Sequence, residues 1–176
     1  MRFKFGMTMI LILHLNAAIS QPGQRISPGV LKNLVGCWNG SLTYLDYSDG
    51  KPFSMPANMV VKDFGNDPRV IYSLMYPKEP RANSTDTLVI SADGRMLNGK
   101  MISEIKNYTK DSIMIVTLEN AVDGNDRQPA LIRHSYLLGS GNYVMKKEVQ
   151  FTGNSQWLVR SEYRFVRTVP CPDETK

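Results

Sequence analysis

The sequence predicts an all-β protein in which an antiparallel up-and-down meander closes into a barrel of about 8 to 10 strands. Apolar and polar residues alternate with a period of two along most of the chain, and almost no segment carries the apolar stripe of a helix. Short clusters of Gly, Asn, Asp and Pro separate the alternating segments, as hairpin turns require. Because a meander pairs each strand with its sequence neighbour and closure removes exposed edges, a barrel is favoured over a two-sheet sandwich.

Residues 1–20 read as a signal peptide. Arg2 and Lys4 precede the apolar run "MTMILILHL", and the small-residue end "AAIS" places cleavage near Ser20. The run is shorter than the roughly 20 apolar residues of a membrane-spanning helix. We therefore expect an exported protein, periplasmic or secreted, without stable membrane insertion. Losing Arg2 and Lys4 lowers the net charge from +5 to +3, and the remaining basic residues are scattered, which argues against nucleic acid as a partner.

The rest of the chain suits one domain. Residues 21–33 form an N-terminal segment with a short helix or turn, because Ser27 is a suitable N-cap and Pro28 follows it. The barrel spans 34–169, and 170–176 form a C-terminal tail. Alternation places the strands at 37–47, 54–64, 69–76, 85–91, 95–105, 112–118, 130–138, 143–151 and 157–166. Antiparallel pairing of the first and last strands needs an even number, so in this odd set one strand is missed or one strand is wrongly split into two.

Cys37 and Cys171 are the only cysteines. Consecutive strand residues point to opposite faces, so if Trp38 points into the barrel, Cys37 points outward, where the C-terminal tail reaches it. In an exported protein the two predict one disulfide. Two unpaired buried thiols are the alternative.

The stretch "GCWNG" resembles the Gly-x-Trp that opens the first strand of the lipocalins and related calycin barrels. Arg167 is placed like the arginine that covers this tryptophan, so the resemblance implies a structural pair of Trp38 and Arg167. The stretches "LTYLDY", "YPKEP", "KKEV" and "RSEYRF" are similar to a largely uncharacterised group of small exported lipocalin-like bacterial proteins. There is no long helix after the last predicted strand, which fits a compact variant better than the larger lipocalins.

The "GxWxG" form is also similar to that of nitrobindin-like haem barrels, in which a histidine on a late strand binds the iron. That resemblance implies a haem-binding alternative that uses His134, with no other cofactor expected. The more apolar face of its strand carries His134 and Tyr136 together.

Alternation places further polar residues on the face expected to point inward: Tyr44, Lys147, Ser161 and Tyr163. With His134 and Tyr136 they are the candidate ligand-binding residues of an otherwise apolar interior. The opposite face of the last strand, which is expected to be solvent-exposed, carries Arg160, Glu162 and Arg164. An inward ammonium at Lys147 needs an acidic side chain, an anionic ligand group or a water-filled mouth.

These observations favour a barrel that binds a small apolar or amphipathic molecule. The alternatives are a structural or protein-interaction module whose barrel is filled by its own side chains, and the haem barrel above. An isomerase or hydrolase using inner tyrosines and Lys147 has the least support, so no enzymatic activity and no metal are expected. The loop "NAVDGNDRQ" has Asp123 and Asp126 but lacks the glycine and distant glutamate of an EF-hand loop, and reads as a solvated hairpin. The oligomeric state is left open.

Overall fold

The computed structural model describes residues 24–46, 49–63, 65, 67–169 and 171. The expected signal peptide, 1–20, lies outside the described residues, as does the C-terminal tail apart from Cys171.

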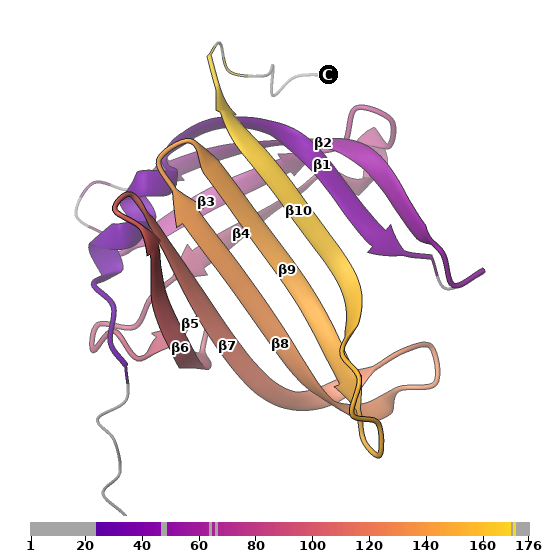
Figure 1. Ribbon diagram of the computed structural model, residues 1–176. Coiled ribbons are helices and arrows are strands. Elements are labelled where there is room, and N and C mark those ends of the chain that lie inside the picture. The colour runs from indigo at the N-terminus through magenta and orange to yellow at the C-terminus, as the bar shows by residue number, and fades with distance from the viewer. Residues whose placement is uncertain (1–23, 47–48, 64, 66, 170, 172–176) are drawn as a thin grey trace, which may run out of the picture.

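The described chain is an antiparallel meander of ten strands that forms a nearly closed barrel (Figure 1). The sheet order β4-β3-β2-β1-β10-β9-β8-β7-β6-β5 places the first strand between the second and the last, as the predicted closure requires. The all-β barrel prediction is confirmed. The elements are the 3-10 helices η1 (Pro28–Leu34) and η2 (Pro80–Ala82) and the strands β1 (Gly36–Leu45), β2 (Pro52–Asp63), β3 (Arg69–Met75), β4 (Ser84–Val89), β5 (Met96–Leu97), β6 (Lys100–Thr109), β7 (Ser112–Asp123), β8 (Gln128–Gly139), β9 (Asn142–Phe151) and β10 (Leu158–Thr168).

The tenth strand comes from the segment predicted as one strand at 95–105. The chain turns at Asn98 and Gly99, whose φ angles are 49° and 74°, so β5 and β6 form a tight hairpin. Asn-Gly is the residue pair that a two-residue hairpin turn favours, because both central positions need positive φ. The odd count from the sequence was wrong because this turn was read as strand.

The barrel is completed only by a weak seam between β4 and β5. A single bridge joins Ile90 to Leu97. The Asn98 side chain adds two hydrogen bonds to the β4 backbone, accepting from the amide of Val89 at 2.8 Å and donating to the carbonyl of Thr87 at 3.2 Å. Within the part of the chain that the structure describes, no ladder pairs β4 with β6. The wall therefore stays open beside the first residues of β6.

One end of the barrel is closed by η1 and by the predicted Trp38–Arg167 pair. Trp38 is fully buried and donates from Nε1 to the carbonyl of Leu34 at 2.8 Å. The Arg167 guanidinium lies 4.2 Å from the Trp38 ring centroid, within cation–π range. It also donates to three carbonyl oxygens, those of Asn33, Val35 and Ser140. The pairing inferred from the sequence is confirmed.

Cys37 and Cys171 form a disulfide with their Cα atoms 5.1 Å apart. The predicted bond is confirmed, and it ties the outer side of β1 to the chain that follows β10. The second glycine of "GCWNG" also has a packing role, because a Cβ atom at Gly40 would lie 1.9 Å from the carbonyl oxygen of Arg164 on β10.

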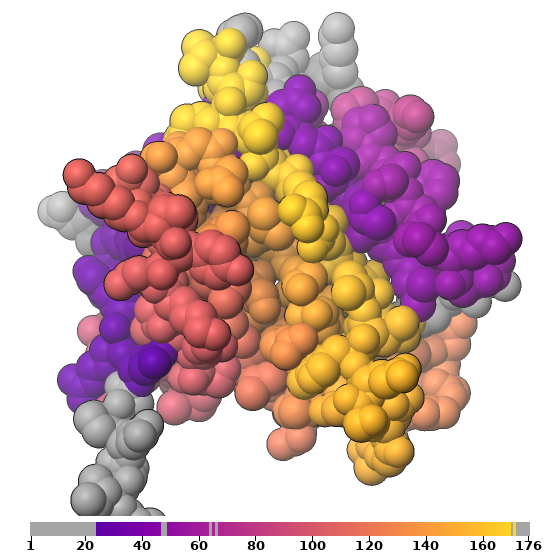
Figure 2. Space-filling model, viewed as in Figure 1, coloured from indigo at the N-terminus to yellow at the C-terminus, as the bar shows by residue number. Residues whose placement is uncertain are grey.

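The interior divides into a packed part and a hollow part. A continuous apolar cluster fills the half beside η1, and its largest fully buried members include Trp38, Leu31, Leu34 and Met59. The hollow part lies toward the seam, where polar side chains replace apolar ones. The outer surfaces of β8, β9 and β10 cover much of the face seen in Figure 2.

Candidate functional site

A cavity of about 340 Å³ lies inside the barrel next to the β4–β5 seam. Five of the six candidate ligand-binding residues line it: His134, Tyr136, Lys147, Ser161 and Tyr163. The sixth, Tyr44, packs against the core and against Phe53 at a centroid distance of 5.6 Å, outside the cavity lining. The remaining lining residues are Tyr72, Asp86, Asn98, Lys100 and Met145.

Strand register explains why these residues meet. Pairing across β7, β8, β9, β10 and β1 places Thr117, His134, Lys147, Ser161 and Tyr44 in one row on the inner face. The neighbouring row on that face runs through Ile115, Tyr136, Met145, Tyr163 and Leu42. The cavity therefore lies between a polar row and a mainly aromatic and aliphatic row.

Arg160 is a correction to the sequence prediction. The register of β10 against β9 shifts between Val159 and Ser161, which marks a β-bulge. The extra residue reverses the alternation, so Val159 is 46% exposed whereas Arg160 is only 8% exposed. The expectation that Arg160 lies on the wet face is therefore wrong. Glu162 and Arg164, beyond the bulge, do form an ion pair near the surface, as their predicted face requires.

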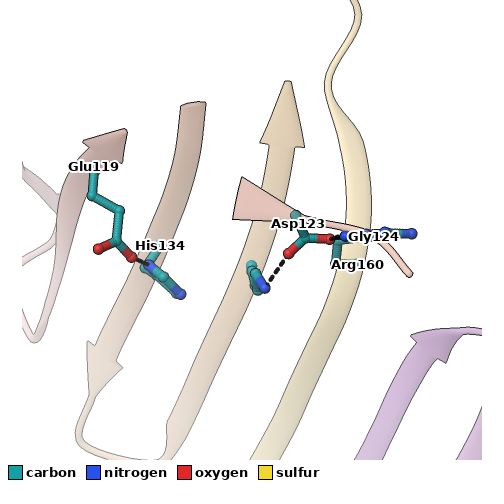
Figure 3. A network of polar contacts seen from close by, with 6 residues as sticks. Glu119, Asp123, Gly124, His134 and Arg160 are labelled. Carbon is teal, nitrogen blue, oxygen red and sulfur yellow. Dashed lines mark hydrogen bonds and ion pairs between the residues drawn. The ribbon is translucent and has the colours of Figure 1, made fainter. Parts of the chain in front are cut away.

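The Lys147 side chain points inward, as predicted, and a protein carboxylate pairs with its positive charge. Its ammonium donates to Asp123 Oδ2 at 2.5 Å, and Arg160 Nε donates to Asp123 Oδ1 at 2.7 Å. The Asp123 side chain is only 5% exposed. Residues 125–129 of its hairpin are exposed, as the sequence suggested, so Asp123 alone departs from the predicted solvated loop. Burial alone would raise the pKa of Asp123, but the bonds from Lys147 and Arg160 outweigh it and lower the pKa. Figure 3 shows Asp123 and Arg160 turned toward each other.

His134 has an unsatisfied ring nitrogen. Its Nδ1 atom is buried without a hydrogen-bond partner and lies 3.8 Å from Glu119 Oε1, toward which it points in Figure 3. Lys100 holds the other carboxylate oxygen of Glu119 at 2.8 Å. Burial lowers the pKa of His134, Glu119 opposes this in part, and Lys100 and Lys147 lower the pKa further. The imidazole is therefore neutral at pH 7.

Two hydroxyl groups near His134 also lack partners. Thr117 is fully buried, and its Oγ1 atom has no hydrogen bond. The Tyr136 hydroxyl makes none within the described residues, and burial, with Glu119 and Asp86 nearby, raises the pKa of Tyr136 to about 12. Tyr136 is thus a protonated donor at neutral pH. Buried polar groups are normally paired, so this cluster is the part of the interior that departs most from an ordinary core.

Sequence reasoning missed several residues of this site. Glu119 is on β7, whose predicted end at residue 118 stopped short of the observed Asp123. Thr117 lies inside the predicted strand, but its inward face was not examined for polar residues. Tyr72 and Asp86 face each other across β3 and β4 at period-two positions. Both strands were predicted. Asp86 was not predicted as a site residue because the seam brings it to the cavity, and no local sequence pattern predicts the seam.

Haem is the one cofactor for which the sequence offers a candidate ligand, His134. Within the described ranges no group of three or more His, Cys, Asp or Glu residues is arranged to hold a metal ion. The cavity of about 340 Å³ has Lys100, Asp86 and Lys147 in its lining beside His134. The haem-binding alternative that uses His134 stays a prediction. No helix in the described residues has the length and apolar character needed to cross a membrane.

No protein-family model and no curated protein sequence matches the chain. Among solved structures, the fold is similar to that of Rv2717c from M. tuberculosis, with a TM-score of 0.53 and 13% sequence identity over 82% of this chain and 99% of that chain. A weaker likeness, with a TM-score of 0.43 and 14% identity, covers 78% of this chain and 48% of a protein with unknown function from the DUF3598 family of Nostoc punctiforme PCC 73102. The first likeness supports the barrel fold alone.

Proposed function

We propose that this protein binds a small amphipathic molecule inside a lipocalin-like barrel. The observation that carries the proposal is the cavity of about 340 Å³, whose lining includes His134 with its unpartnered, buried ring nitrogen. A buried polar atom without a partner costs about 1–3 kcal/mol, which a ligand that hydrogen-bonds to it recovers. A barrel serving only as a scaffold gains nothing from keeping this cost.

The chemistry of the cavity favours an amphipathic ligand over a purely apolar one. Tyr136, Met145 and Tyr163 offer apolar surface, whereas His134 and Ser161 offer hydrogen bonds. Lys100 and Lys147 are already held by Glu119 and Asp123. The sequence left open an anionic ligand group as the partner of Lys147, and the ion pair with Asp123 removes the need for one.

Two alternatives receive less support. A barrel filled by its own side chains accounts for the packed half near η1 but not for the hollow half near the seam. An enzyme needs a nucleophile and base in reach of each other, and within the described residues no hydroxyl or thiol is hydrogen-bonded to His134. We therefore treat the protein as a binder.

We also propose that the protein works outside the reducing cytosol. The disulfide supports this, because such bonds persist in oxidising compartments. The signal peptide expected at 1–20 is the route that the sequence offers.

Native mass spectrometry of protein purified from its own cells tests the binding proposal. We expect a non-covalent adduct on the parent protein that Ser161→Phe removes, because the larger side chain fills the cavity. Ser135→Phe is the matched control: Ser135 pairs with Val116 and Lys146 on the outer face, so its variant should keep the adduct. An adduct retained by Ser161→Phe and lost from Ser135→Phe would place the ligand elsewhere.

A further inference from the structure

One charge that faces the cavity has no partner of opposite sign. Asp86 lines the cavity, and within the described residues no Lys, Arg or His forms an ion pair with it. The nearest lysine that lines the same cavity along the seam, Lys100, is held by Glu119 at 2.8 Å. Every other carboxylate next to the cavity is compensated by the protein, and Asp86 is not.

The two contacts of Asp86 leave room for a cation. The amide of Thr87 donates to Asp86 Oδ1 at 2.7 Å, and the Tyr72 hydroxyl donates to Asp86 Oδ2 at 3.4 Å. A carboxylate has about four acceptor sites, so two such donors do not exhaust it. The 3.4 Å contact with Tyr72 is too long for a strong hydrogen bond, but it places the carboxylate beside an aromatic ring that also lines the cavity.

The surroundings of Asp86 suit an organic ammonium group better than a metal ion. Three tyrosines, Tyr72, Tyr136 and Tyr163, line the cavity beside it and come from strands β3, β8 and β10. Tyrosine ring faces attract cations, and most strongly where water is excluded. The negative charge of Asp86 also helps to raise the pKa values of Tyr72 and Tyr136, after the larger effect of burial, so its field reaches into the cavity.

The same carboxylate lies at the unpaired part of the wall. Asp86, Asn98 and Lys100 all belong to the seam where β4 and β6 are not paired. Asp86 is exposed although its side of β4 is the inner one, which follows from its position at this opening. A ligand entering through the seam therefore meets Asp86 first and the tyrosines next.

From this arrangement we infer that the ligand is a small protonated amine with an aromatic or alkyl body, its ammonium at Asp86 and its body against Tyr136, Met145 and Tyr163. The inference rests on the proposed interior binding site and adds the charge and orientation of the ligand. Lys100 does not repel the ammonium strongly, because Glu119 pairs with it. Asp123 is shared by Lys147 and Arg160, so that group keeps a net charge of +1 and favours placing the ammonium at Asp86 rather than beside Lys147.

Isothermal titration calorimetry with three probes of one shape tests the inference: 2-phenylethylamine, 2-phenylethanol and 3-phenylpropanoate. A charge-assisted hydrogen bond contributes enough that we expect the amine to bind about tenfold more tightly than the alcohol, and the carboxylate to bind most weakly. Asp86→Asn should remove the advantage of the amine and leave the affinity for the alcohol unchanged. Asp111→Asn, in the β6–β7 turn, is the control and should behave like the parent.

The outcomes separate this inference from the proposed function. Equal binding of amine and alcohol, or an amine preference that survives Asp86→Asn, would overturn the assignment of the amine and leave interior binding in place. Tighter binding of 3-phenylpropanoate would overturn it in favour of Lys147 as the ligand's partner. If none of the probes binds at millimolar concentration, and the protein from its own cells carries no adduct, both the amine assignment and the proposed function fail.

Discussion

At the scale of single residues, the Asp123 carboxylate holds the cavity wall together. The two carboxylate oxygens of Asp123, on β7, accept hydrogen bonds from Lys147 on β9 and Arg160 on β10, so residues of three strands meet at one charge. The bulge at Val159 is what turns Arg160 inward to make this contact. Removing the carboxylate would leave two cations near each other in a poorly hydrated place.

We predict that Asp123→Asn lowers the free energy of unfolding by about 3 kcal/mol at pH 7, the cost of breaking a buried ion pair from one side. The pKa of Asp123 is lowered in the folded state, so its stabilisation is complete above the unfolded value of about 3.9 and is lost as the pH falls through the lower folded value. Urea unfolding from pH 7 to pH 2 should show parent and variant differing by a constant amount down to about pH 5 and converging below pH 4. A difference that stays constant to pH 2 would contradict the role of the charge.

Lys147→Met should cost less, about 1–2 kcal/mol, because Arg160 still compensates Asp123 and the Lys147 side chain is 33% exposed. Chemical denaturation at pH 7 measures the loss. A loss as large as that of Asp123→Asn would mean that Arg160 does not share the charge.

Arg167→Ala should lower stability by about 2 kcal/mol while leaving ligand binding intact. The substitution removes the cation–π contact with Trp38 and three hydrogen bonds to backbone carbonyls at the end of the barrel opposite the cavity. Thermal unfolding and calorimetry with 2-phenylethylamine measure the two effects. A variant as stable as the parent would show that the stacking seen here carries no net free energy.

At the scale of elements, the seam between β4 and β5 is the weakest part of the wall. Two backbone hydrogen bonds cross it, from the Asn98 amide to the Val89 carbonyl at 2.8 Å and from the Ser91 amide to the Met96 carbonyl at 2.9 Å. The Asn98 side chain adds bonds to Val89 and Thr87 while its own backbone adopts a positive φ. A short edge held by so few bonds opens more easily than a full ladder.

Asn98→Gly should therefore loosen this seam without straining the turn, because glycine tolerates the φ of 49° but cannot bond to β4. Hydrogen exchange at the Val89 amide should become at least tenfold faster, whereas amides at the β1–β10 ladder should be unaffected. Asn98→Asp keeps the acceptor for Val89 and loses the donor to Thr87. Its Val89 exchange rate should therefore lie between the rates of the parent and of Asn98→Gly. An unchanged Val89 exchange rate in Asn98→Gly would show that the bridge at Ile90 closes the wall alone.

The elements also show what the sequence could and could not predict. Alternation identified most strands and the inward side of β9, because one buried face fixes the orientation of every residue on a regular strand. It failed at Asn98-Gly99, a turn hidden between two apolar pairs, and at Arg160, where a bulge reverses the alternation. Both failures lie at the cavity. Asn-Gly is itself a local turn signal that was read as strand, whereas a bulge is decided by tertiary contacts that a local pattern does not contain.

At the scale of the whole molecule, the disulfide links the start of β1 to the chain after β10 and encloses nearly the entire barrel, with a sequence separation of 134 residues. Replacing Cys37 and Cys171 with Ser should lower the free energy of unfolding by about 3–5 kcal/mol, chiefly by freeing the unfolded chain. Urea unfolding of the double variant and of the reduced parent should give the same midpoint. A midpoint equal to that of the oxidised parent would mean that the β1–β10 ladder already supplies the constraint.

The central claim is that the barrel holds a small molecule between its polar row and its tyrosines. A crystal structure of the protein purified from its own cells, without unfolding, tests this most directly. We predict continuous density inside the barrel, within hydrogen-bond distance of His134 or Tyr136, with one end that reaches Asp86. Isolated waters in the cavity, or a ligand bound only in the larger pocket of about 870 Å³ beside η1, whose lining includes Asn33, Asn107 and Lys110, would contradict it.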